Sequence, residues 1–267
     1  MSLLSIGAHL NYQVPRPMDI LLQLEAADGY GQTVLASRLD FPAHSGLSRI
    51  AGQDGVGERI WFNTCGNMVV DYSADVMIDR HDIDLCQLDA LPTNRLDGEA
   101  TRYLMPSTYC PAFDFVPFVQ KKFHGLSGGS LVMAMRDWIL NSFEYVIGAS
   151  NHRTTATETF VQRQGVCRDF THVLISLCRA AAIPARFASV YAPNVKPQDF
   201  HAVAEVYLDG YWYLVDPTGM ASADKTAVIG VGCDAADVAF MTSIGMVSFV
   251  EQSVEVQTKN TSPLELN

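Results

Sequence analysis

Residues 201–217 read HAVAEVYLDGYWYLVDP, and this stretch predicts a β-hairpin whose register can be counted from its turn. Asp209-Gly210 supplies the two positive-φ positions of a two-residue type I′ turn. With that turn, Val203 lies opposite Asp216 on the neighbouring strand. His201 shares a strand face with Val203, so His201 and Asp216 are predicted to be diagonal neighbours within hydrogen-bonding reach.

A paired histidine and carboxylate are suited to proton transfer. The carboxylate of Asp216, bonded to one nitrogen of His201, would fix the tautomer and stabilise the imidazolium. The other ring nitrogen would remain free to take a proton from a nucleophile. Pro217 ends the strand directly after Asp216 and fixes the chain direction there.

A candidate nucleophile lies upstream, where Gly165-Val166-Cys167 opens a predicted helix that runs to Ala182. Pro184 prevents the helix from continuing. The positive end of the helix dipole favours the thiolate form of Cys167, and the free N–H groups of the first turn can hold an oxyanion. Gly165 would allow a sharp entry and a close approach of substrate to the backbone.

Each of these residues also has a plain structural interpretation. Cys167 fits a small buried residue at a helix start, His201 a histidine near a strand start, and Asp216 a turn-forming Asp-Pro. The three occur together in the order Cys, His, Asp, with the nucleophile on a helix start and the pair on a hairpin. This combination predicts a catalytic triad of Cys167, His201 and Asp216 that acts on an amide or related acyl bond.

The sequence resembles the core of the bacterial transglutaminase-like superfamily over roughly Gly129–Gly219. The resemblance is carried by the following segments: Thr155–Phe160, Gly165–His172, Leu177–Ala180, Ile183–Arg186, Phe200–Ala202 and Tyr213–Thr218. It implies a papain-like cysteine catalytic core whose triad falls on Cys167, His201 and Asp216. Family members span protein-glutamine acyl transfer, peptide or amide hydrolysis, and inactive relatives. Nothing in the sequence resembles the calcium sites of the animal transglutaminases, so calcium activation is not implied.

The chain as a whole predicts an α+β fold. Short alternating strands separated by turn residues fill residues 1–102 and predict an antiparallel β-sandwich domain, a module of the kind that often accompanies bacterial members of the family. A proline-bearing stretch predicts a linker over 103–117 that packs against the protein. Residues 118–267 are then the transglutaminase-like catalytic domain, with helices followed by strands, including a last pair near 228–231 and 247–256.

The sequence also predicts roles for other residues near the triad motifs. His172 lies on the same helix as Cys167 but about 140° around it, which predicts a structural role, and Cys178 is predicted to lie in the core. A second oxyanion donor is expected upstream of the nucleophile, with Tyr145 and Gln162 as candidates. Tyr207 and Trp212 face each other across the hairpin, either lining the acyl site or packing. Arg168 and Arg186 are expected to pair with acidic neighbours.

The charge composition limits the classes of partner that the protein can bind. The formal net charge is −11 and the isoelectric point about 4.9, which argues against binding to nucleic acid or to an anionic membrane surface. No stretch approaches the roughly 18 apolar residues of a membrane span, and the N-terminus is a poor signal peptide, so a cytoplasmic location is expected. Six dispersed cysteines without a C-x-x-C pair predict reduced thiols and no metal site or cofactor.

Three functions are compatible with these features. The first is a cysteine hydrolase of peptide or amide bonds, in which water resolves a thioester on Cys167. The second is a transglutaminase, in which an amine resolves the same thioester. The third is a non-catalytic binding module that retains the fold. The sequence does not separate the first two, because the choice depends on how the site admits water or a second substrate.

Overall fold

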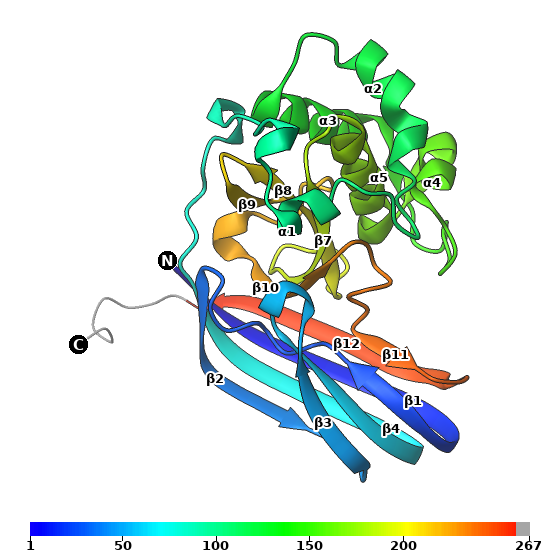
Figure 1. Ribbon diagram of the computed structural model, residues 1–267. Helices are drawn as coiled ribbons and strands as arrows, with labels where there is room; N and C mark the ends of the chain where they lie inside the picture. Colours follow the sequence, from blue (N-terminus) through cyan, green and yellow to red (C-terminus); the bar gives the residue numbers. More distant parts are fainter. Residues whose placement is uncertain (260–267) are drawn as a thin grey trace, which may run out of the picture.

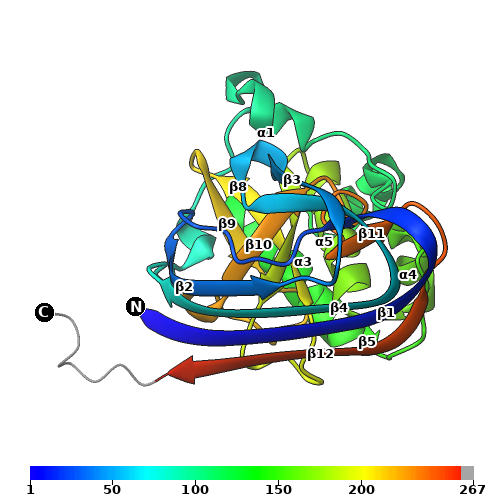
Figure 2. The same cartoon turned by 90° about the horizontal axis from the view of Figure 1, so that it is seen from below.

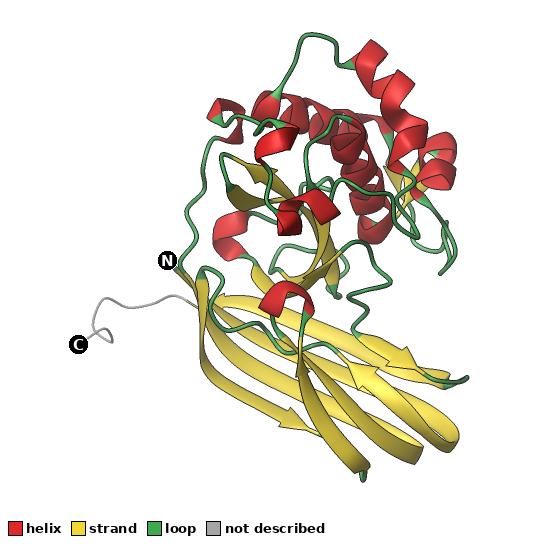
Figure 3. Ribbon diagram, viewed as in Figure 1, coloured by secondary structure: helices red, strands yellow, loops and turns green. Residues whose placement is uncertain are grey.

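The computed structural model describes residues 1–259 and consists of two packed parts, which we call the β-module and the mixed core (Figure 1). The β-module is a six-stranded antiparallel sheet. The mixed core, residues 79–240, holds all five α-helices of the described chain and a second antiparallel sheet (Figure 3). The α+β class predicted from the sequence is confirmed.

The β-module is built around two long strands, β1 (Ser2–Leu22) and β4 (Glu58–Ile78), which pair along nearly their whole length. The shorter strands flank them: β2 (Gln32–Asp40), β3 (Ser45–Ala51), β11 (Met241–Ser243) and β12 (Ser248–Lys259). β2 and β3 both pair with β4, while β11 and β12 both pair with β1, so the strands form one continuous sheet (Figure 2). From residue 4 to residue 22 the even-numbered residues of β1 are buried, except Arg16 at an irregularity in the pairing, and the odd-numbered ones are more exposed, as the alternation predicts.

The predicted domain limits differ from the structure at both ends. The chain leaves the β-module at Ile78 rather than near residue 102, and residues 79–102 already lie along the mixed core. The prediction that 118–267 is one catalytic domain is corrected by β12, which pairs with Leu3–Gln13 of β1 and returns the chain to the first sheet. A long-range pairing of this kind leaves no local signal in the sequence. Residues 260–267 of the predicted domain lie outside the described residues.

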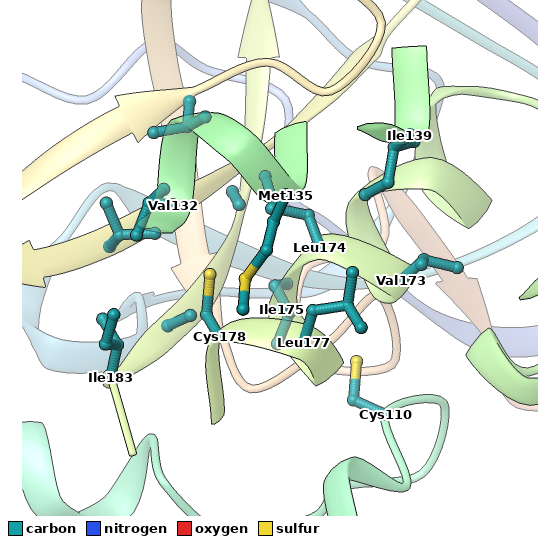
Figure 4. Close-up of a cluster of buried hydrophobic side chains, with 14 of the residues drawn as sticks. Cys110, Val132, Met135, Ile139, Val173, Leu174, Ile175, Leu177, Cys178 and Ile183 are labelled. Atoms are coloured by element: carbon teal, nitrogen blue, oxygen red, sulfur yellow. The ribbon is translucent and has the colours of Figure 1, made fainter. Parts of the chain in front are cut away.

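The mixed core is organised around one buried helix, α5 (Cys167–Ala180), in which every residue from 169 to 179 is buried. The helix α3 (Gly128–Ser142) and the sheet β10-β7-β8-β9 pack against it. Figure 4 shows the apolar contacts at its centre, where Leu174, Leu177 and Cys178 meet Met135. The sheet strands are β7 (Ala185–Tyr191), β8 (His201–Leu208), β9 (Tyr211–Val215) and β10 (Ala227–Gly232).

The remaining elements are short. They are α1 (Gly98–Arg102), α2 (Val116–Lys122), α4 (Ala156–Gln162), and the two-residue strands β5 (Glu144–Tyr145) and β6 (Gln164–Gly165). Thr155 caps α4 and exchanges hydrogen bonds with Glu158. The helix α4 ends at Arg163, which adopts a left-handed conformation. The predicted linker 103–117 is packed down, with Tyr103 and Cys110 fully buried.

The two parts are joined by backbone and apolar contacts. Tyr191, Ala227 and Ile229 of the core sheet pack into the apolar face of the β-module. The backbone N–H of Ala27 donates to the carbonyl of Val228 at 2.8 Å. These contacts hold β10 and the end of the neighbouring strand β7 against the β-module. Among residues 1–259, no helix combines the length and apolar content of a membrane span.

Candidate active site

Cys167 is the first residue of α5, as predicted, and its side chain is partly exposed. The start of the helix is capped by the carboxylate of Asp169, which accepts from the backbone N–H of Val166 at 2.9 Å. Asp169 is completely buried and pairs with Arg168 at 2.7 Å. The thiol is therefore presented at a helix N-terminus whose first turn is held rigidly.

Gly165 has a packing role that the sequence did not predict. A Cβ atom at this position would lie 2.8 Å from the Cβ of Asp169 and 3.0 Å from its carboxylate oxygen. Glycine is thus required so that the capping side chain can pack against the backbone. The residue secures the geometry of the nucleophile turn through this close approach.

The hairpin β8–β9 has the predicted register, with Ala204 opposite Val215 and Tyr207 opposite Trp212. As that register requires, Nε2 of His201 lies 3.0 Å from Oδ2 of Asp216, and both side chains are buried. A carboxylate only accepts hydrogen bonds. Nε2 of His201 therefore carries a proton and donates it to Asp216 in this hydrogen bond. The pairing predicted from turn chemistry is confirmed as a contact.

The carboxylate of Asp216 is held by the loop that follows it. The backbone N–H of Thr218 donates to Oδ1 at 2.8 Å, and those of Met220 and Ala221 donate to Oδ2 at 2.9 and 2.7 Å. The Thr218 hydroxyl donates to the same group. Burial by itself would raise the pKa of Asp216, but the hydrogen bonds from His201 and Thr218 outweigh it and lower that pKa. The carboxylate is therefore fixed and ionised.

The imidazole of His201 is only half satisfied. Its Nδ1 atom is buried and has no hydrogen-bond partner among residues 1–259. Burial lowers the pKa of the ring, but hydrogen bonding to Asp216 and interaction with the Cys167 side chain reverse this and raise it to about 10. Cys167 thus lies close enough to act on the charge of His201. The raised pKa means that the ring of His201 is an imidazolium at neutral pH.

Tyr145 is brought to the nucleophile, whereas Gln162 is not. The short strand β5 runs parallel to β6 and places Tyr145 opposite Gly165, with Val146 N–H donating to the Gly165 carbonyl at 2.9 Å. Burial first, and then the charge of Cys167, raise the pKa of Tyr145, so its hydroxyl stays protonated. Gln162 lies exposed at the end of α4 and makes no hydrogen bond within the described residues.

The other singled-out residues have structural contacts. His172 is fully buried, stacks on Tyr109 with ring centroids 5.0 Å apart, and accepts from the Ala235 N–H. Trp212 lies 4.0 Å from the Arg186 guanidinium and 5.0 Å from Tyr207, so these rings pack away from the acyl site. Arg186 pairs with Glu205 and with Asp54 of the β-module, each at 2.8 Å.

Three contributions to the site were missed from the sequence. The N–H groups of Met220 and Ala221 hold Asp216 through a loop whose path no local pattern specifies. Aspartate often accepts a hydrogen bond from the backbone N–H two residues later in a turn. The sequence Asp216-Pro217-Thr218 fits this pattern, so it could have identified Thr218 as a partner of Asp216. The Arg136 guanidinium on α3 donates to the Asp216 carbonyl at 3.3 Å, a contact that only the folded chain reveals.

Comparisons with known proteins agree with this architecture. The model of the Transglutaminase-like superfamily matches residues 124–217, which include Cys167, His201 and Asp216. A crystal structure from Cytophaga hutchinsonii, provisionally named as a cysteine protease, is 32% identical and superposes with a TM-score of 0.91. That match covers 98% of this chain and 92% of that one. The chain belongs to the transglutaminase-like superfamily.

Curated relatives match over shorter regions. An uncharacterized protein of Mycobacterium leprae is 27% identical over 152 residues, which are 53% of this chain and 54% of that protein. An uncharacterized protein of Mycobacterium tuberculosis is 31% identical over 126 residues, which are 40% of each chain. The matched regions therefore span about half or less of the length of these relatives. The full-length fold match and the superfamily together support an enzyme of the cysteine-protease type.

Proposed function

We propose that the protein is a cysteine hydrolase of peptide or amide bonds, with Cys167 as nucleophile, His201 as general acid and base, and Asp216 as the residue that orients the imidazole. The observation that carries this proposal is the half-satisfied His201. Asp216 holds Nε2 at 3.0 Å, while the buried Nδ1 has no partner within the described chain and lies near Cys167. The name of the Cytophaga hutchinsonii relative supports proteolysis rather than another acyl reaction.

The reaction begins with attack of the Cys167 sulfur on the substrate carbonyl carbon. The negative charge that develops on the oxygen is met by N–H groups of the first turn of α5 and by the protonated hydroxyl of Tyr145. His201 then gives its Nδ1 proton to the leaving amine as the carbon–nitrogen bond breaks, which leaves a thioester. In the second half, water attacks the thioester while His201 takes its proton, and the carbon–sulfur bond breaks to release the acid and the thiolate.

Residues of this chain would also restrain the catalytic groups between the steps. Five hydrogen-bond contacts from Thr218, Met220 and Ala221 keep the Asp216 carboxylate in place. The carboxylate then has no freedom to turn from His201 when the ring gains or loses its proton. Preorganisation of this type contributes to the rate because the groups need no rearrangement in the transition state.

The test is incubation of the protein with a tryptic digest of casein and a labelled primary amine, followed by mass spectrometry. Hydrolysis predicts new peptide termini or deamidated glutamine without label, and an acyl adduct on Cys167 after rapid acid quenching. The matched control is Cys167→Ala, which should form neither product nor adduct. Incorporation of the amine in place of hydrolysis would replace the proposal with transglutamination. Product formation that survives in Cys167→Ala would exclude the mechanism.

A further inference from the structure

The strand β9 has an open edge. It is the last strand of the sheet order β10-β7-β8-β9, and within residues 1–259 it pairs only with β8. The N–H and C=O groups on its other edge therefore have no strand partner in the described chain. Exposed rows of such groups are templates for another extended segment unless something covers them.

A cavity of about 640 Å³ runs along this edge. All residues from Gly210 to Asp216 line it in unbroken succession. Adjacent side chains of a strand point to opposite faces, and here Trp212 packs on Arg186 while Tyr213 packs against the helical core. Because residues of both faces line the cavity, it lies beside the strand edge and not over one face of the sheet.

The opposite wall is a second segment, residues 80–84, which lies outside any helix or strand and leads away from the end of β4 (Figure 1). In the described chain, residues 80–83 take part in no backbone–backbone hydrogen bond. The space is thus a channel between two lengths of chain with unpaired backbone groups. Met133 and Arg136 of α3 close one side, and Tyr30 and Ala221 close the other.

The charged groups that line the channel carry both signs. The Arg80 guanidinium donates to the carbonyls of Tyr30 and Thr226, and the buried Glu205 accepts from Arg186 and Tyr30. The other ionisable side chains of the lining are divided among the segment after β4, the helix α3 and the end of β9: His81, Asp82, Asp84, Arg136 and Asp216. A second copy of the folded chain would need a strand able to enter the channel. What matches the unpaired backbone groups along both walls is another extended backbone.

We infer that this channel binds an extended peptide segment, which adds to β9 as a further strand. Strands lie about 4.8 Å apart, and the five residues of β9 offer a contact length of about 17 Å. Backbone hydrogen bonds supply affinity in this mode, and alternate side chains enter pockets on either side. Apolar side chains available to such a peptide line the channel, among them those of Leu85, Met133, Leu214 and Ala221.

The peptide site is continuous with the proposed active site at one residue. Asp216 lines the end of the channel, and Ala221, which also lines it, donates to the Asp216 carboxylate. Cys167 and His201 do not line the channel. The inference therefore goes beyond the proposed function and does not depend on it. Peptide binding can be measured whether or not the protein hydrolyses anything.

The experiment is a selection of random decapeptides displayed on phage, using the full chain as Cys167→Ala so that turnover plays no part. Binders are then measured by fluorescence anisotropy against two further variants. Met133→Trp places a large ring in the channel. Asn141→Trp puts the same ring on an exposed position of the same helix, outside the channel, and serves as control. The inference predicts that selected peptides lose at least about tenfold in affinity to Met133→Trp and less than about twofold to Asn141→Trp.

A second measurement tests the strand mode itself. Each selected peptide is resynthesised with N-methyl groups on alternate residues, in both possible phases. Because only every second N–H of a strand points toward a given neighbour, methylation in one phase should cost about tenfold or more while the other phase costs much less. The inference is overturned if the selection yields no binder or if the selected peptides bind Met133→Trp as well as the parent protein. It is also overturned if N-methylation in the two phases costs the same affinity.

Discussion

Two buried clusters of charge lie on the hairpin β8–β9, and they differ in how completely they are satisfied. In the middle of the sheet, Arg186 uses its nitrogens on Glu205, Asp54, Glu99 and the Tyr30 hydroxyl. At its end, His201 uses one nitrogen on Asp216 and leaves the other without a partner in the described residues. The clusters are close along the chain, since Glu205 is on the same strand as His201.

The difference separates a structural role from a chemical one. A complete network such as that of Arg186 joins strands and loops of both parts of the molecule, and a proton transfer there would break several bonds. An incomplete network, such as that of His201 and Asp216, costs stability because a buried polar atom lacks a hydrogen bond, but it leaves that atom available for reaction. The available nitrogen occurs beside the thiol at the helix start. Substitutions in the two clusters should therefore affect different measurements.

The largest effect is expected from Cys167→Ala. Removal of the nucleophile should lower kcat for the casein peptide that is hydrolysed fastest by about 10⁴-fold or more, because no thioester can form. Thermal unfolding should change little, since the side chain is partly exposed. The control is Cys65→Ala, which removes an exposed thiol elsewhere and should keep wild-type kcat. Equal kcat in Cys167→Ala and Cys65→Ala would mean that the cluster around His201 has no catalytic role.

Glu205→Gln should act on stability instead. It leaves the buried Arg186 without the charge of its most buried carboxylate partner, and loss of one partner of a buried pair costs about 3–5 kcal/mol in the free energy of unfolding. Urea denaturation measures this. Glu58→Gln, which weakens an exposed pair with Arg49, should cost at most about 1 kcal/mol. A similar cost for the two variants would mean that the Arg186 network does not hold the molecule together.

Tyr145→Phe tests whether the Tyr145 hydroxyl is the second oxyanion donor. Loss of one donor to the developing oxyanion should lower kcat by about 10²-fold and leave KM nearly unchanged, because the bond forms mainly in the transition state. Gln162→Leu, at the exposed candidate that the structure does not bring to Cys167, should have no effect on kcat. A rise in KM without a fall in kcat for Tyr145→Phe would assign the hydroxyl to substrate binding instead.

The smallest effect is on the pH profile. Since the pKa of His201 is raised to about 10, the imidazolium that protonates the leaving amine persists through neutral and mildly alkaline pH. We expect kcat/KM to stay level from pH 8 to 9 and to fall above, with an apparent pKa near 10 that reports the loss of the His201 imidazolium. Asp216→Asn removes a group that raises this pKa, so the fall should move to lower pH. A fall near the ordinary imidazole value of about 6.5 in the wild type would contradict the charge state.

The hairpin and the start of α5 were predictable because their signals are local. Asp209-Gly210 fixes the turn, and pairing then follows residue by residue to the contact between His201 and Asp216. The start of α5 at Cys167 followed from Gly165 and the apolar stripe. The cause assigned to Gly165 was nevertheless incomplete, because its tight contact with Asp169 depends on packing that spacing alone does not specify.

Long-range features were not predictable from patterns. The strand β12 alternates as a strand should, yet nothing in its sequence specifies that it pairs with β1. The parallel contact of β5 with β6, which brings Tyr145 rather than Gln162 to the nucleophile, involves only two residues on each side. Such short pairs carry no periodicity. Their positions follow from the packing of the helices around them.

The central claim is that the sulfur of Cys167 and the free nitrogen of His201 act as one unit, and the rate of alkylation by iodoacetamide at pH 6.5 tests it most directly. Peptide mapping gives the rate at each thiol, with the exposed Cys65 and Cys86 as internal references. We expect Cys167 to react about tenfold or more faster than either reference, and His201→Ala to remove this advantage. Equal rates at the three thiols in the wild type, or a fast Cys167 in His201→Ala, would contradict it.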